Sequence, residues 1–423
     1  MNNMRLFKKS LLAVTVTLAT QQAFAAGFQL NAQSATGLGR AFAGDAVIAD
    51  NAAVMSRNPA AMALFDEMAL SLGFETITTD IKVKNATYTS PTVQKNANYD
   101  DAGGTSVAPN IHLIVPVNEQ FAWGVNAYSN FGTRTEFEKN YVASEYGGET
   151  EILSVNLGVS GSYRIDNQWS VGAGLDLIYG QGTLKRAFSD TFYTGPVTTN
   201  PTTGMLKALN GRSVVDISKA DGFGIGFNVG TVYELDENNR FGLSYRYSPT
   251  ITAKDGDKEV KLPLPDLAEF SGYHRIENTA FAVHYSIQYI GWSAFDKLEF
   301  KNQSINEKPY QWQDGWHYSI GGTYYLNRDW TLRTGYMYDT SAQDKITSIS
   351  VPDSDRQWLS AGFTYHIDEK SNIDFGLTYL MGKDVKVNEQ TKNPLNPSTN
   401  LSSISGTTHA DAILFGLQYS RTF

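Results

Sequence analysis

The chain has 423 residues, a formal net charge of −9 and 18% charged residues, which is below the ~25% usual for soluble domains. It contains 37 glycines, 12% aromatic residues and no cysteine, which excludes a disulfide framework, thiolate metal sites and thiol nucleophiles. On average the chain is too polar for a bundle of membrane helices, each of which needs ~20 apolar residues. Its acidic charge balance also argues against nucleic-acid binding.

The N-terminus has the order of a secretory signal peptide. Basic residues at positions 5 to 9 precede the apolar stretch Leu11–Ala19, and the small-residue sequence Ala23-Phe24-Ala25 follows. The apolar run is too short to span a bilayer, so export with cleavage after Ala25 is predicted for residues 1–25. Removal of three basic residues would change the formal net charge from −9 to −12.

Residues 26–66 are dominated by small side chains and show no sustained alternation. Short helical turns are expected, because Asp50 or Asn51 could cap one turn and Asn58 could cap another with Pro59 at its first position. The segment is too small to form a core of its own, so it needs another part of the chain to pack against.

Alternating apolar and polar residues return many times between residues 67 and 423. Residues 169–179 place Trp, Val, Ala, Leu, Leu and Tyr on one face, against Ser, Gly, Gly and Asp on the other. The same period of two occurs at residues 153–162 and 372–381, and Tyr and Trp gather near the ends of such stretches. A soluble sheet could share the alternation, but aromatic girdles at strand ends are typical of a transmembrane β-barrel.

Connections of two lengths separate these stretches. Short Asn- and Asp-rich turns, such as 164–168 and 326–329, alternate with long polar segments at 84–105, 189–215, 339–355 and 388–408. This asymmetry is that of periplasmic turns and extracellular loops. About fourteen strands are predicted, which begin near Met68, Val107, Phe121, Thr150, Gln168, Lys219, Asn239, Lys258, Thr279, Lys308, Trp330, Arg356, Ser371 and Thr408.

The fold expected is therefore an all-β, antiparallel transmembrane barrel over residues 67–423, with residues 26–66 as a helical hatch that plugs the lumen. A barrel of this width would leak without a plug. The last strand ends on the aromatic Phe423, which resembles the signal that the barrel assembly machinery recognises. These features together predict the outer membrane of a Gram-negative bacterium.

Several motifs, in order along the mature chain, resemble the bacterial long-chain fatty-acid outer-membrane transporters, the FadL family. They are residues 26–31 (AGFQLN), 37–41 (GLGRA), 56–60 (SRNPA), 130–132 (NFG), 233–240 (YELDENNR) and 349–356 (ISVPDSDR). The resemblance implies a barrel of fourteen strands with an N-terminal hatch. It also implies passive inward movement of hydrophobic acids, so the expected ligand is a long-chain fatty acid or a similar hydrophobic molecule.

By the same resemblance, Asn58, Pro59 and Ala60 form the hatch element that packs against a kinked third strand. The kink would fall at Phe131 and Gly132, where glycine permits a break in the ladder and a lateral gap in the wall. An acyl chain would leave sideways into lipid more readily than through an aqueous lumen. The plainer alternatives are a helix cap at Asn58 and an ordinary small lumen residue at Gly132.

The ligand's carboxylate would meet Arg186 and Lys308, with Phe28 near the same apolar pocket. One or two cations beside an apolar cavity suit a molecule with an acidic head and a long tail. The plainer alternative for Arg186 is an exposed charge at the rim. Asp339 and Arg356 match polar positions that would tie the hatch to the wall.

Three other functions remain open from the sequence. The first is an outer-membrane lipase or other enzyme, although none of the six histidines belongs to a His-Glu-x-x-His motif and no Gly-x-Ser-x-Gly motif occurs. The second is a general diffusion porin, and the third is a channel of the same family for aromatic or other hydrocarbons. No cofactor, metal or nucleic acid is expected, and the partners expected are outer-membrane lipid and lipopolysaccharide around a monomer.

Overall fold

The computed structural model describes residues 27–31, 33–393 and 396–423, so the predicted signal peptide lies outside the described residues. Fourteen antiparallel strands form a closed wall, because the first pairs with the last from Ala69↔Thr422 onward. In order around the barrel they are β1 (Ala69–Thr89), β3 (Thr105–Pro116), β4 (Phe121–Tyr128), β6 (Glu149–Arg164), β7 (Trp169–Ala187), β8 (Ser213–Asp236), β9 (Asn239–Tyr247), β12 (Leu267–Arg275), β13 (Phe281–Ile290), β16 (Gly315–Tyr325), β17 (Trp330–Asp339), β18 (Arg356–His366), β19 (Ser371–Gly382) and β21 (Asn396–Thr422). The predicted fold class and strand number are confirmed.

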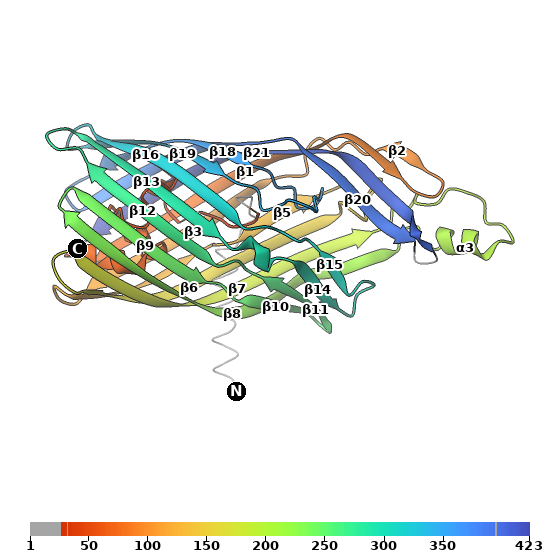
Figure 1. Cartoon of the computed structure of the whole chain (residues 1–423), viewed down its shortest axis with the longest axis horizontal. Coiled ribbons are helices and arrows are strands. Elements are labelled where there is room, and N and C mark those ends of the chain that lie inside the picture. Colours follow the sequence, from red (N-terminus) through yellow and green to blue (C-terminus); the bar gives the residue numbers. More distant parts are fainter. Residues whose placement is uncertain (1–26, 32, 394–395) are drawn as a thin grey trace.

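The two ends of the barrel differ (Figure 1). One end carries short turns and the C-terminus. The other carries the extra elements β2 (Gln94–Asn96), β10 (Thr250–Asp255), β11 (Lys258–Pro263), η3 (Trp292–Ala294), β14 (Lys297–Lys301), β15 (Glu307–Pro309), β20 (Val385–Asn393) and the helix α3 (Pro201–Lys207). By the rule that periplasmic turns are short, the elaborated end faces outward.

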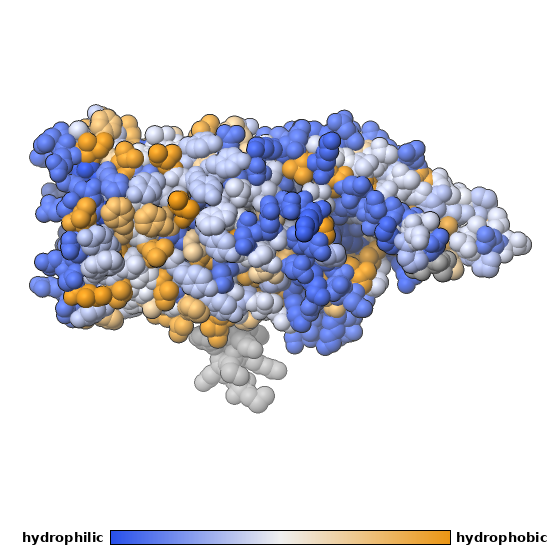
Figure 2. Space-filling model, in the orientation of Figure 1, coloured by the Kyte–Doolittle hydropathy of each residue, from blue (hydrophilic) through white to orange (hydrophobic). Residues whose placement is uncertain are grey.

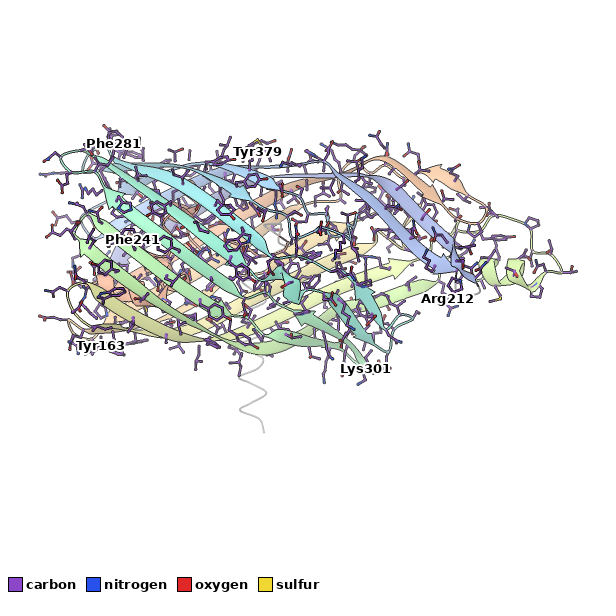
Figure 3. All side chains as sticks on the ribbon, in the orientation of Figure 1. Tyr163, Arg212, Phe241, Phe281, Lys301 and Tyr379 are labelled. Carbon is purple, nitrogen blue, oxygen red and sulfur yellow. The ribbon has the colours of Figure 1, made fainter. Side chains whose placement is uncertain are left out.

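The outer surface changes in polarity along the barrel axis (Figure 2). Apolar residues gather over the half with short turns, whereas hydrophilic residues dominate the elaborated half. Tyr163, Phe241 and Phe281 lie near the short-turn end, and Tyr379 lies nearer the middle (Figure 3). No helix among the described residues is long and apolar enough to cross a membrane.

The strands extend further outward than the alternation predicts. Residues 388–393 and 396–408, which belong to a segment expected to form a loop, instead lie in the paired strands β20 and β21. The starts predicted at Lys219 and Thr408 are too late for β8 and β21, and those predicted at Lys258 and Lys308 are too early for β12 and β16. Beyond the bilayer both faces of a strand can be polar, so the apolar pattern does not mark the strand's true end.

The N-terminal segment, described over residues 27–31 and 33–64, lies within the barrel, and its helical turns lie toward the short-turn end (Figure 1). It contains α2 (Ala35–Gly39), η1 (Ala52–Ser56) and η2 (Pro59–Leu64), which begin after the caps Ser34, Asn51 and Asn58. Each cap accepts a hydrogen bond from a backbone N–H of its own helix through its side-chain oxygen. The capping predicted for Asn58 and Pro59 is confirmed.

Glycines of the wall let this segment come close to the strands. A Cβ atom at Gly335 of β17 would lie 2.1 Å from the Arg40 carbonyl oxygen, and one at Gly376 of β19 would lie 2.4 Å from the Ala35 carbonyl oxygen. Only a residue without a side chain permits such backbone contact. The wall is therefore shaped to hold the segment.

The C-terminus completes the ladder next to β1. The Phe423 N–H donates to the Met68 carbonyl oxygen at 3.0 Å, and the ring is about half exposed. Recognition of this residue by the assembly machinery stays a prediction, as do the monomeric state and the lipid partners.

Candidate functional site

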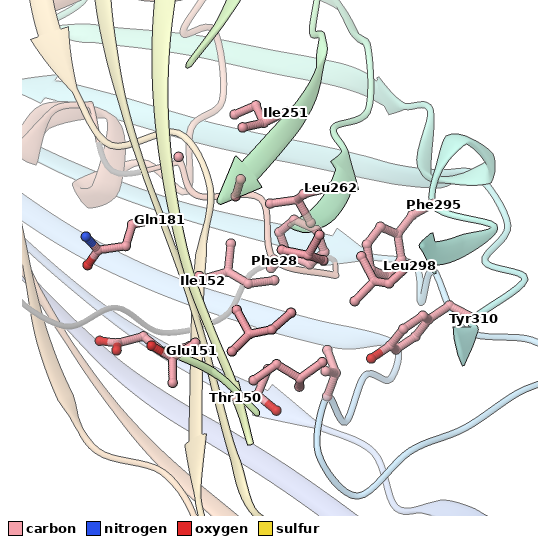
Figure 4. A pocket seen from close by; sticks show the side chains of 18 residues that line it. Phe28, Thr150, Glu151, Ile152, Gln181, Ile251, Leu262, Phe295, Leu298 and Tyr310 are labelled. Atoms are coloured by element: carbon pink, nitrogen blue, oxygen red, sulfur yellow. The ribbon is translucent and has the colours of Figure 1, made fainter. Parts of the chain in front are cut away.

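An apolar pocket lies where the outward ends of the strands meet the start of the N-terminal segment (Figure 4). It encloses about 600 Å³ of space, part of it open to solvent. Phe28, Leu262, Phe295 and Leu298 point toward one another from separate elements, and Ile152, Ile251 and Tyr310 add to the lining. Such a cavity suits a largely apolar ligand.

Phe28 is buried at the centre of an aromatic cluster. Its ring centroid lies 4.5 Å from that of Trp292, 5.2 Å from that of Phe295 and 5.6 Å from that of Trp312. Phe131 of the interrupted strand is 6.2 Å away. Edge-to-face contacts of this kind add to the stabilisation from apolar burial. The structure therefore places Phe28 in the pocket wall, where the sequence analysis expects it.

Arg186 lies at the outward end of β7 and is 4% exposed, so it is not a charge on the rim. Its guanidinium donates to the carbonyl oxygens of Glu149 at 2.7 Å and Lys185 at 2.8 Å, and to the hydroxyl of Thr150, which lines the pocket. Its Nε has no hydrogen-bond partner among the described residues. Burial lowers the pKa of Arg186 to about 10. An anion would therefore gain from binding here.

Lys308, in β15, lies near Tyr310, a residue of the pocket lining. Its Nζ lies 5.3 Å from the ring centroid of Tyr310 and 3.8 Å from Oε2 of Glu389. Tyr310 and Glu389 also act electrostatically on Arg186. The structure thus brings both predicted cations to one pair of neighbours beside the apolar pocket.

Sequence reasoning missed these two neighbours and most of the apolar lining. The lining of β10 and β11 has a readable signal, because Ile251 and Ala253 alternate with polar residues, as do Val260 and Leu262. Glu389 has none, because its contact with Lys308 joins β15 to β20 across a long stretch of sequence.

Asp339 and Arg356 form part of a buried polar chain between the wall and the N-terminal segment. Arg356 pairs with Asp339 at 3.0 Å and with Asp353 at 2.9 Å. Asp353 accepts from the Gly27 N–H at 3.3 Å. On the other side of Asp339, His317 lies 3.3 Å from the carboxylate and contacts Asn31 at 3.4 Å. Asp339 of β17 and Arg356 of β18 therefore belong to the polar chain that joins the wall to the N-terminal segment.

Asn58, Pro59 and Ala60 lie against β7 and β8, and the helix η2 that begins at Pro59 also contacts β4, the first part of the interrupted strand. Asn58 donates to the Thr231 carbonyl oxygen of β8 at 3.0 Å. A Cβ at Gly172 of β7 would lie 2.4 Å from the Ala60 nitrogen. The motif fits there because Gly172 of β7 and Gly230 of β8 have no side chain.

The third wall strand is interrupted at the predicted place. β4 ends at Tyr128, and β5 (Gly132–Glu136) continues the pairing with β6. The start of the N-terminal segment fills the break: the Leu30 N–H donates to the Asn130 carbonyl oxygen and the Gly132 N–H donates to the Phe28 carbonyl oxygen, each at 2.8 Å. Residues 28–30 are therefore the part of the segment that is hydrogen-bonded at the kink.

Comparison with known proteins agrees with this architecture. The family described as "Outer membrane protein transport protein (OMPP1/FadL/TodX)" matches residues 16–423. A long-chain fatty acid transport protein of Escherichia coli O6:H1 is 39% identical over 92% of this chain and 94% of its own. The crystal structure of a Pseudomonas aeruginosa FadL homologue superposes with a TM-score of 0.80, at 21% identity, over 94% of this chain and all of its own. The toluene transporter TodX of P. putida shares the fold, with a TM-score of 0.63 at 19% identity over 88% of this chain and 94% of its own. The chain therefore belongs to the OMPP1/FadL/TodX family of transport proteins and lies in the outer membrane of a Gram-negative bacterium.

Proposed function

We propose that this protein takes up long-chain fatty acids through the outer membrane without an energy source of its own. The acyl chain lies in the apolar pocket around Phe28, and its carboxylate binds near Arg186 and Lys308. The observation that carries the proposal is that Lys308 and Arg186 share the neighbours Tyr310 and Glu389, beside a pocket lined mostly by apolar side chains. The name of the E. coli relative agrees with an acidic apolar substrate.

In this proposal residues 26–66 act as the hatch. Their contacts with wall glycines and the ion pairs of Arg57 with Glu269 and of Asp50 with Arg333 support a tight seal of the lumen. The acyl chain leaves sideways at the interruption before Gly132, because transfer into lipid removes apolar surface from water. The backbone bonds of residues 28–30 to the kink support a link between the pocket and this exit.

A channel for neutral aromatic hydrocarbons is the alternative, since TodX has the same fold. The two cations favour an acid over a hydrocarbon, because a carboxylate can form charge-assisted hydrogen bonds with them and a neutral hydrocarbon cannot. Catalysis is not part of the proposal.

Binding of oleate and of oleyl alcohol to the detergent-purified protein tests the ligand. Arg186→Ala is expected to weaken oleate binding about tenfold, the size of one charge-assisted hydrogen bond, and to leave alcohol binding unchanged. Equal affinity of the wild type for both ligands would favour the hydrocarbon alternative.

Uptake tests the exit. Gly132→Trp in cells that depend on this protein for oleate should stop growth on oleate while the purified variant still binds it. Gly161→Trp is the control, because a Cβ at this wall position meets no atom closer than 3.6 Å. Normal growth with Gly132→Trp would refute the lateral route.

A further inference from the structure

An acidic side chain of the protein already lies at the cations expected to hold the ligand's acid. Oε2 of Glu389 is 3.8 Å from Nζ of Lys308, and the side chain is 10% exposed. Oε1 accepts a hydrogen bond from the Ile349 N–H at 2.8 Å. The same carboxylate raises the proton affinity of Arg186 through its charge. A resident anion thus lies beside Lys308 and acts on Arg186 through its charge.

We propose that Glu389 is an internal competitor for the ligand's head group and sets how strongly the pocket distinguishes acids from neutral apolar molecules. The inference rests on the proposed function. An incoming carboxylate must share or replace the Glu389 contact before it gains the full attraction of Lys308. A neutral molecule with the same tail leaves that contact in place, so Glu389 lowers affinity for the acid alone.

The position of Glu389 suits this role because its two carboxylate oxygens have different partners: Oε1 accepts from the Ile349 N–H, and Oε2 lies near Lys308. Oε1 helps to hold the loop that carries Ile349, and a neutral amide oxygen could accept the same hydrogen bond. The Thr347 hydroxyl donates to the Lys386 carbonyl oxygen at 3.0 Å, which joins the same loop to β20 independently. Lys308 also keeps its contact with Tyr310. The charge of Glu389 can therefore be removed while its neighbours stay in place.

The test is Glu389→Gln in the full-length, detergent-purified protein, titrated with oleate and with oleyl alcohol. The variant should bind oleate about three- to tenfold more tightly, as expected for a partly screened like charge, and bind the alcohol as the wild type does. Glu307→Gln is the matched control: it removes an equal charge from β15, where the exposed Glu307 pairs with Lys297 at 2.7 Å. This control should leave both affinities unchanged.

A double-mutant cycle assigns the effect to Lys308. In a Lys308→Met background, Glu389→Gln should bring a smaller gain in oleate affinity, because the cation for which both acids compete is missing. An unchanged oleate affinity in Glu389→Gln, or an equal change for oleate and alcohol, would overturn the inference while leaving the proposed function intact. A wild type that fails to bind oleate would instead refute the proposed function itself.

Discussion

Gly230 of β8 faces the side chain of Asn58 so closely that a methyl group has no room there. A Cβ at this position would lie 2.0 Å from Oδ1 and 2.9 Å from Cγ of Asn58. Asn58 cannot swing away freely, because it is fully buried and bonds to Ala46 and Thr231 through Nδ2 and to the Ala60 N–H through Oδ1. Gly230→Ala should therefore loosen η2 from β7 and β8.

The expected cost combines two effects. Overpacking of a tight site costs ~1–3 kcal/mol, and each displaced hydrogen bond of Asn58 adds ~1 kcal/mol. A total of about 2–4 kcal/mol corresponds to a local opening constant raised about 30- to 1,000-fold.

Hydrogen exchange followed by mass spectrometry measures this opening. Peptides that cover residues 51–66 should exchange faster in Gly230→Ala, while peptides of the wall strands on the far side keep wild-type rates. The control is Gly322→Ala in β16, where a Cβ meets only the Ala282 carbonyl oxygen, at 3.6 Å, among the described atoms. Equal exchange of residues 51–66 in both variants would refute the idea that wall glycines hold the segment.

Three further variants probe other contacts of the described structure. Burial raises the pKa of Glu145 from 4.5 to about 7, so the ordered loop disfavours the charged form. Glu145→Gln keeps the hydrogen bond from Tyr88 and should stabilise the outward loops by ~3 kcal/mol above pH 7 and by almost nothing below pH 4.5. Hydrogen exchange at pH 5 and pH 8 measures the difference. Phe28→Ala should cost ~3–5 kcal/mol of local stability through the cavity it leaves, seen as faster exchange of residues 27–33 and weaker binding of oleate and oleyl alcohol alike. Arg57→Met should cost ~3–5 kcal/mol, because it leaves the buried Glu269 carboxylate without its cation at 3.3 Å, and pulse proteolysis of the hatch would report the loss.

The wall could be predicted from the sequence because the bilayer imposes a local rule on it. Within the lipid, each strand must expose apolar side chains on one face, so residues 169–179 show a period of two that is readable in isolation. Beyond the lipid that requirement ends. Residues 396–407 of β21 are mostly small and polar, and they read as a loop although they are paired with β20.

The site was predictable only in part, because its contacts join distant segments. The resemblance to known transporters points to Arg186 and Lys308, and the structure brings both to one pocket mouth. It cannot point to Glu389, whose role depends on how β20 folds over that mouth. The seat of residues 58–60 against Gly172 of β7 and Gly230 of β8 was not predictable for a similar reason: in a chain with 37 glycines, nothing local tells which ones meet the N-terminal segment.

Two kinds of contact hold the N-terminal segment against the wall. Glycines of the wall set how closely the segment approaches. A row of glycines alone would allow the segment to pack at more than one position along the barrel axis. Buried ion pairs remove that freedom: Asp50 of the segment lies 3.3 Å from Arg333 of β17 and 2.8 Å from Arg40, and Arg57 lies 3.3 Å from Glu269 of β12. A shift of the segment by one residue would leave these charges buried without their partners, and the desolvation free energy would cost several kcal/mol for each ion. These ion pairs thus fix the register of the N-terminal segment, while the glycines fix its distance from the wall.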